Sequence, residues 1–429
     1  MSIYKLCDFS THKYSFPFFL GLTILLLTAL AWVNTFIQDD AFISFRYAEN
    51  LNNGRGLVWN EGEKVEGYTN FLWTLLISGS LWLGFEPVIF TRVLGIYFFV
   101  ISLFLTARVS ILIFENRNLS LLTVLLLGTN YTFSAYATGG LETQLQACLF
   151  LACIYTLLWS HEQNQIGFRA LSLLSLLMAI AMLTRPDSAV LVGIIFPLAF
   201  FLVLLEQITP RNKAIKIMAL SIPFLVLVGS WLIWKLLYYG DILPNTFYVK
   251  VPNSSLFRGA YYLYIFLFSY WLIPLLILGC FEIRRLVNQQ KSTLLILISF
   301  IFLWLAYIVK IGGDFMEFRL FVPILPLIFI LITALIYITQ HKRVQIALVI
   351  LILAGSVHHA LTFGRSTDQY AIITVKQLNG YLSDTGEKWI KIGQVLRSSF
   401  QQNQNITIAT TAAGAIPYYS GLKPLICTV

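Results

Sequence analysis

Two adjacent carboxylates, Asp39 and Asp40, directly follow an apolar stretch that runs from residue 16 to residue 37. Ionisable groups at the end of a membrane-spanning segment are costly to place and usually functional. Like charges this close raise the pKa of one carboxyl, which suits it to proton transfer or cation binding. One Asp would be enough to cap a helix that starts at Ala41. The pair therefore indicates a catalytic site.

Further polar segments interrupt the apolar sequence. They read DDAFISFRY at 39–47, VEGYTN at 65–70, TGGLET at 138–143, TRPD at 184–187, GDILPNTFYVK at 240–250 and GGDFMEFR at 312–319. Such groups, with Gly- or Pro-containing backbone, are tolerated at membrane depth where they line a cavity. If the segments converge, their cations are candidates to bind phosphate. These cations are Arg46, Arg185, Lys250 and Arg319.

Some residues of these polar segments also have a purely structural interpretation. Arg46 could pair with Glu49 or Glu66 as a bridge between segments. The turn at 185–187 could simply join two helices, since Pro is favourable in a first helical turn. Glu142 could be an acid favoured by the dipole at a helix start.

Composition places these residues in a membrane protein. Hydrophobic residues make up 58% of the 429 positions, charged residues make up 11%, and mean hydropathy is +0.77. The net charge of +9 does not indicate nucleic-acid binding, because the basic residues are spread over short loops. Apolar segments long enough to cross a core of about 30 Å are found at 16–37, 87–107, 119–138, 141–159, 168–184, 187–206, 217–238, 260–281, 293–310, 320–339 and 344–363. We predict an all-α polytopic membrane protein with about eleven spans.

Loop charges predict the orientation in the membrane. With the N-terminus inside, the inner segments carry thirteen Lys and Arg residues and the outer loops before residue 364 carry seven, which is the positive-inside pattern. The apolar stretch 71–84 is short enough to be interfacial or re-entrant rather than a span. The predicted domains are a membrane domain at 1–363, with a first outer loop at 38–70, and a small α/β extracytoplasmic domain at 364–429.

The run DDAFISFRYAENLNNGRGLVWNEGEKVEGYTNFLW at 39–73 resembles the first outer loop of the GT-C superfamily of polytopic glycosyltransferases, in particular its AftB/LphB-like subgroup. The segments TRPD, GDILPNTFYVK, GGDFMEFRLFVPILP and AGAIPYYSGLK are similar to that subgroup's pattern and occur in its order. The resemblance covers nearly the whole chain, and the first loop is its most specific part.

The resemblance implies an inverting glycosyltransferase. Its sugar would come from a polyprenyl-phosphate lipid donor and go to a cell-envelope glycan or glycolipid acceptor at the outer face of the cytoplasmic membrane. A first-loop acid would be the general base, which matches Asp39 or Asp40, and cations would stabilise the departing phosphate. The sugar and acceptor pocket would be lined by Glu66, Tyr68, Asn70, Glu142, Asp187 and Asp314. No cofactor is required with certainty, and a divalent cation shared by the acid pair stays open.

Two alternatives stay open as well. A transporter or flippase of lipid-linked glycans would be equally apolar, but such proteins usually carry charged features near the bilayer midplane and internal repeats. The predicted spans are nearly free of charge, with Arg92 the clearest exception. The resemblance also implies a C-terminal region that continues past the YYSGLK motif for longer than this chain does, so an inactive, truncated relative is the second alternative.

Overall fold

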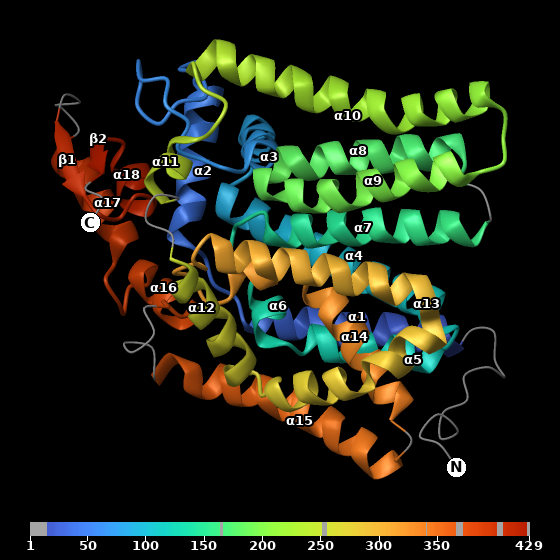
Figure 1. The fold of residues 1–429 in the computed structure, drawn as a ribbon. Helices are drawn as coiled ribbons and strands as arrows, with labels where there is room; N and C mark the ends of the chain where they lie inside the picture. Colours follow the sequence, from blue (N-terminus) through green and yellow to red (C-terminus); the bar gives the residue numbers. More distant parts are fainter. Residues whose placement is uncertain are drawn as a thin grey trace.

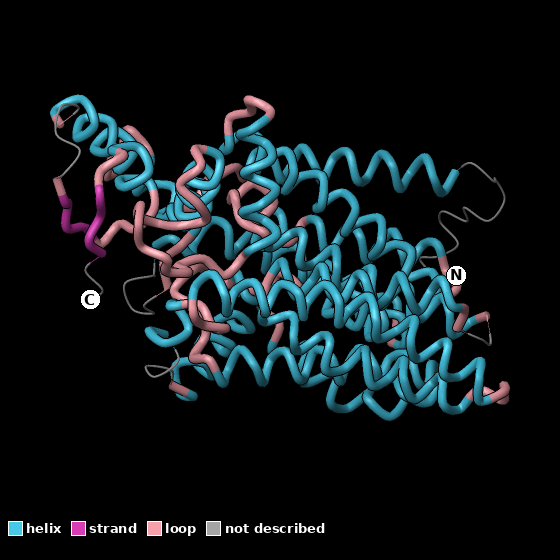
Figure 2. Tube along the Cα trace, turned by 90° about the horizontal axis from the view of Figure 1, so that it is seen from above, coloured by secondary structure: helices cyan, strands magenta, loops and turns pink. Residues whose placement is uncertain are grey.

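Long helices run side by side through most of the molecule, and short elements gather at one end of them (Figures 1 and 2). This arrangement comes from a computed structural model. The structure describes residues 15–163, 166–250, 255–339, 341–365, 372–400 and 406–426.

Among the described residues, seven helical stretches are long and apolar enough to cross a membrane. They are α1 (Ser15–Val33), α4 (Pro87–Phe114), α7 (Thr143–Glu162), η2 and α9 (Pro186–Ser188 and Ala189–Leu205), α10 (Pro210–Tyr239), the stretch Thr293–Lys310 of α13 (Ile273–Lys310), and α15 (Lys342–Thr362). An eighth span would be the pair of α12 (Leu256–Ser269) and Ile273–Glu282, which is bent by 96°. Shorter apolar helices are α3 (Phe71–Trp82), α5 (Arg117–Gly128), α8 (Phe168–Thr184) and α14 (Leu325–Ile338).

Every apolar segment predicted to span is helical, which confirms an all-α polytopic membrane protein. Two of these segments are not straight. The segment 119–138 divides into α5 and the short α6 (Tyr131–Ala135), because the Asn130 side chain accepts a hydrogen bond from the amide of Phe133 and starts a new helix. The segment 260–281 bends where Trp271 takes a left-handed backbone conformation (φ +54°).

Helix α3 agrees with the prediction that 71–84 does not cross the membrane. Its 12 residues extend only about 18 Å at 1.5 Å per residue, which is well short of a core of about 30 Å. By contrast α7 lies inside the bundle, with 83% of its apolar window buried against 22–33% for the other six long stretches. The first residues of α7 therefore lie near the centre of the bundle, at one of its ends.

The short elements at that end form a cap. They are α2 (Asp39–Asn52), α11 (Asn245–Lys250), α16 (Val375–Leu382), α17 (Trp389–Ser399), β1 (Thr407–Thr410), α18 (Ala415–Ser420) and β2 (Lys423–Ile426). Strands β1 and β2 pair in parallel, with Thr407 opposite Lys423. This confirms the mixed α/β character predicted for the C-terminal segment, whereas the domain boundary at residue 364 stays a prediction.

Helix α2 lies across the ends of the long helices rather than along them (Figure 1). The junctions that carry the predicted polar segments, before α7, between α8 and α9, after α10 and between α13 and α14, open toward the same end. The segments predicted to converge on one side of the protein therefore do so.

Candidate active site

Helix α2 presents different faces to different parts of the protein. Positions 39, 42 and 46 have i, i+3 and i+7 spacing and share one face, whereas positions 40 and 44 have i, i+4 spacing and share another. Asp39 is buried, with 8% of its surface exposed, and Asp40 is half-buried. The two adjacent acids therefore have different surroundings.

The face that carries Asp39 contacts the C-terminal segment 414–422. Asp39 Oδ1 accepts a hydrogen bond from the amide of Ala415 at 2.7 Å, and Oδ2 accepts one from the amide of Gly414 at 2.9 Å. Burial raises the pKa of Asp39 to about 7, although the two amide donors oppose that rise. Both oxygens of this carboxylate are thus used within the protein.

Arg46 holds the same segment farther along α2. Its guanidinium donates to the carbonyls of Pro417 at 2.6 Å and Leu422 at 3.0 Å, and its Nε donates to the carbonyl of Trp59 at 2.9 Å. Arg46 was a candidate for phosphate binding or for a bridge to Glu49 or Glu66. Its hydrogen bonds among the described residues go to backbone carbonyls and to Asn60 instead, which gives it a structural role of another kind. We therefore leave it out of the phosphate site proposed below.

The face that carries Asp40 points toward buried polar groups. Ser44, one turn after Asp40, donates a hydrogen bond to Asn70 Oδ1 at 3.1 Å. Asn70 Nδ2 in turn donates to Glu142 Oε2 at 2.8 Å. The predicted residues Asn70 and Glu142 are therefore in direct contact, on the side of α2 where Asp40 lies.

Glu142 stands just before α7 and is 1% exposed. Its Oε1 accepts a hydrogen bond from Arg185 Nη1 at 2.6 Å. Arg185 lies at the junction of α8 and α9, where its Nε donates to Asp187 Oδ2 at 2.9 Å. Asp187 Oδ1 accepts a further hydrogen bond from Gln146 Nε2 at 2.7 Å. One arginine thus joins two predicted acids from separate segments.

Arg319 approaches from the segment between α13 and α14, within η3 (Arg319–Phe321). Its Nη2 lies 2.7 Å from Asp314 Oδ2. Burial lowers the pKa of Arg319, but the charges of Asp314, Asp40 and Glu142 outweigh burial and raise it, so Arg319 stays cationic. Arg319 Nε has no hydrogen-bond partner among the residues that the structure describes.

The charge state of Glu142 follows from the same neighbours. Burial raises its pKa, but Arg185, Arg319 and the Asn70 amide outweigh burial, so the pKa of Glu142 lies below its ordinary value. We call this group the polar cluster. Its members are Asp40, Asn70, Glu142, Arg185, Asp187, Asp314 and Arg319.

Two curated relatives are similar to this chain over most of its length. The terminal β-(1→2)-arabinofuranosyltransferase of Mycobacterium tuberculosis is 25% identical over 329 residues, which are 67% of this chain and 51% of the relative. The protein of the same name from Corynebacterium glutamicum is 25% identical over 353 residues, which are 70% of this chain and 48% of the relative. The chain therefore spans about half the length of these relatives. No family model matches it.

Two solved structures have the same fold. ArnT from Cupriavidus metallidurans, bound to undecaprenyl phosphate, aligns with a TM-score of 0.57 at 11% identity and covers 97% of this chain and 86% of its own. The oligosaccharyltransferase AglB from Archaeoglobus fulgidus, in complex with an inhibitory peptide and a dolichol-phosphate, aligns with a TM-score of 0.55 at 10% identity and covers 99% and 65%. The chain therefore has the fold of these GT-C glycosyltransferases.

Two residues predicted for the sugar pocket have other partners. Glu66 Oε2 lies 2.7 Å from Lys235 Nζ, and the two side chains are 4% and 1% exposed. The Tyr68 hydroxyl lies 3.2 Å from that of Tyr239. These contacts attach the first loop to the end of α10, outside the polar cluster. The fourth predicted cation, Lys250, ends α11, and its side chain lies outside the part of the chain that the structure describes.

Several buried polar residues of the chain were not predicted from the sequence. Ser44 and Gln146 are uncharged and gave no signal in the sequence. Lys235 is a lone charge in the apolar run WLIWKLLYY, which is the kind of signal that marks a buried partner. Glu317 Oε1 lies 2.8 Å from Nε2 of His359, a contact that joins the 312–319 segment to α15.

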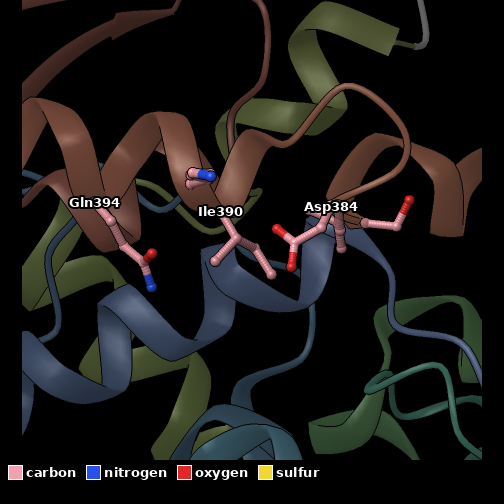
Figure 3. Close-up of a pocket in the computed structure, with 6 residues that line it drawn as sticks. Asp384, Ile390 and Gln394 are labelled. Carbon is pink, nitrogen blue, oxygen red and sulfur yellow. The ribbon is translucent and has the colours of Figure 1, made fainter.

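Other places in the structure add nothing to the site. No group of three or more His, Cys, Asp or Glu side chains lies close enough to hold a metal ion, judged on the described residues alone. A surface depression between α16 and α17 is lined by Leu382, Ser383, Asp384, Ile390, Lys391 and Gln394 (Figure 3). None of these residues belongs to the polar cluster.

Proposed function

We propose that this chain, which has the GT-C fold, is an inverting glycosyltransferase. It takes a sugar from a polyprenyl-phosphate lipid and transfers it to a cell-envelope glycan or glycolipid at the outer face of the cytoplasmic membrane, with the cap on the outside. The observation that carries the proposal is the polar cluster, in which the negative charge of Asp40 acts on the buried cation Arg319. The arabinofuranosyltransferase relatives and the undecaprenyl phosphate bound by ArnT support the same reaction class.

Asp40 is the proposed general base. The base must lie within hydrogen-bond reach of the acceptor hydroxyl, so the half-buried acid of the cluster suits the task. Asp39 suits it less, because both of its oxygens already accept backbone hydrogen bonds. Asp40 would take the proton of the acceptor hydroxyl as that oxygen attacks the anomeric carbon and the lipid phosphate departs.

Arg319 is the proposed contact for the departing phosphate. Its Nε is a buried donor without a partner among the described residues, and a preorganised cation stabilises the charge that develops on the leaving group. Arg185 is enclosed by Glu142 and Asp187. In this proposal Arg185 attracts the phosphate through its positive charge. It also holds Glu142 and Asp187 in place.

The polar cluster carries more acids than arginines, so transfer could depend on a divalent cation. Asp40, Glu142, Asp187 and Asp314 are four acids against two arginines. A phosphate would therefore meet uncompensated negative charge unless a carboxyl is protonated or a divalent cation enters with the donor. Carboxylate oxygens suit hard cations. Transfer assayed with and without a chelator, and after adding back Mg²⁺ or Mn²⁺, would test this.

Sugar transfer by the purified chain tests the proposal. The protein in nanodiscs is incubated with radiolabelled polyprenyl-phosphate pentoses and hexoses and with membrane glycolipids as acceptors. We expect label on an acceptor with wild type, and a loss of about 100-fold or more in Asp40→Asn, the range for a general base. Glu49→Gln is the matched control, because Glu49 is an exposed acid on the same helix.

Three outcomes would contradict the proposal. Full transfer by Asp40→Asn would remove Asp40 as the base. Movement of the lipid donor across the bilayer without transfer would favour the transporter. Neither transfer nor donor binding by wild type would reject the proposed enzyme activity of this chain.

A further inference from the structure

The C-terminal segment 414–422 contacts α2 at both of its ends. At its start the amides of Gly414 and Ala415 donate to Asp39. The carbonyls of Pro417, within the segment, and of Leu422, at its far end, accept hydrogen bonds from Arg46. Hydrogen bonds with one charged partner are stronger than those between neutral groups, so the Arg46 guanidinium holds its end of the segment firmly. At the other end, two backbone amides bind the same Asp39 carboxyl group.

Aromatic rings join the two elements between these ends. The ring of Phe42 lies 5.6 Å from that of Tyr418 and 5.5 Å from that of Tyr419, and Phe45 lies 6.0 Å from Tyr418. Ring centroids at 4.5–7 Å contribute beyond the apolar area that they bury. Residues 39, 42 and 46 thus form one continuous surface of α2 that binds the segment.

The start of the segment has no room for a larger residue. A Cβ atom on Gly414 would lie 1.9 Å from the backbone oxygen of Asp39 and 2.7 Å from its carboxyl carbon. Because a backbone oxygen cannot rotate away, the segment and the first turn of α2 would have to separate. Glycine is needed here for close approach between the two.

We propose that the C-terminal segment is a positioning element of the active site. By clamping α2 through Asp39 and Arg46, it sets the orientation of the neighbouring Asp40 carboxylate toward the polar cluster. Asp39 and Arg46 are then positioning residues, not groups that touch substrate. This inference rests on the proposed function, in which Asp40 is the base.

The reason is geometric. Asp40 follows Asp39 directly in the first turn of α2, where helical backbone hydrogen bonds are incomplete. That turn is fixed from outside by the two amides of the segment. A shift of about 1 Å in a catalytic group can lower the rate about 100-fold. Loss of the clamp would therefore reduce the rate of transfer more than it reduces binding of the donor.

The test uses variants that leave both acids in place. Gly414→Ala separates the segment from Asp39. Arg46→Lys keeps the charge but loses the planar fork that reaches two carbonyls, so it provides a second variant if the first fails to fold. Lys423→Gln is the control, because Lys423 directly follows the segment and forms an exposed ion pair with Glu63, which lies outside α2.

Two readouts are needed, steady-state transfer and amide hydrogen exchange in nanodiscs. We expect kcat to fall about 100-fold in Gly414→Ala and Arg46→Lys, with little change in KM for the donor. Exchange should become faster both in 414–422 and in the first turn of α2. Lys423→Gln should match wild type.

The outcomes separate this inference from the proposed function. Wild-type kcat in a variant whose 414–422 segment exchanges faster would overturn the clamp and leave the role of Asp40 intact. A parallel rise in KM would make the segment a donor-binding element instead, which also overturns it. If wild type transfers no sugar, the proposed function fails. The clamp is then judged by exchange alone, and unchanged exchange in α2 would refute it.

Discussion

The Glu66–Lys235 pair offers a direct test of how this protein uses its buried charges. Glu66→Gln removes one partner of an ion pair whose atoms lie 2.7 Å apart and whose side chains are almost fully buried. The sequence predicted Glu66 in the sugar pocket, whereas the structure pairs it with a helix of the bundle. If Glu66 lines the sugar pocket, Glu66→Gln should reduce transfer. If Glu66 is a structural partner of Lys235, the substitution should reduce stability.

The expected cost is about 3 kcal/mol in the free energy of unfolding. Breaking a buried pair costs about 3–5 kcal/mol, because the remaining charge is left without a partner. We take the lower limit because Lys235 Nζ also lies 4.9 Å from the ring centroid of Trp231, which offsets part of the loss. Burial raises the pKa of Glu66 in spite of the lysine, so the attraction between the two charges does not fully offset the cost of removing the carboxylate from water. Removing both charges in Glu66→Gln/Lys235→Met should therefore restore most of the stability.

The assay is unfolding in mixed micelles of mild and denaturing detergent, followed by tryptophan fluorescence. Glu61→Gln is the control, because Glu61 belongs to an exposed ion pair with Arg55 in the same loop, and exposed pairs contribute little. Sugar transfer is measured on the same samples. If Glu66→Gln unfolds like wild type but transfers no sugar, Glu66 acts on the substrate and the structural reasoning is wrong.

Three further predictions concern the phosphate site, pH and topology. Arg319→Gln should weaken binding of undecaprenyl phosphate to the protein in nanodiscs, whereas the exposed Arg55→Gln should not, and equal affinities would remove Arg319 from the phosphate site. Because the pKa of Asp39 is raised to about 7 in the folded chain, from about 3.9 in an unfolded one, the folded chain binds more protons between these values. The free energy of unfolding should fall as pH rises from about 4 to about 7, and a wild-type slope in Asp39→Asn would contradict this. A reporter fused after residue 86 should lie outside and one after residue 163 inside, and a cytoplasmic signal at residue 86 would invert the topology.

The sequence by itself determined the class of protein and the residues from which its site is built. Apolar runs long enough to cross a bilayer must be helical, because a membrane offers no other partner for backbone polar groups. For the same reason the charges outside these runs had to gather at the ends of the helices. Asn70, Glu142, Arg185 and Asp187 could thus be named from the sequence and are in contact.

Only the tertiary structure shows which partner each charged residue has. Asp39 and Asp40 are indistinguishable in the sequence, but the backbone amides that bind Asp39 belong to a segment 375 residues away. In the same way Arg46 and Glu66 match the chemistry of a ligand site until the carbonyls of Pro417 and Leu422 and the ammonium of Lys235 are placed beside them. The partners that the fold gives a charge determine how far that charge can serve a substrate. Long-range packing, not local spacing, settles that.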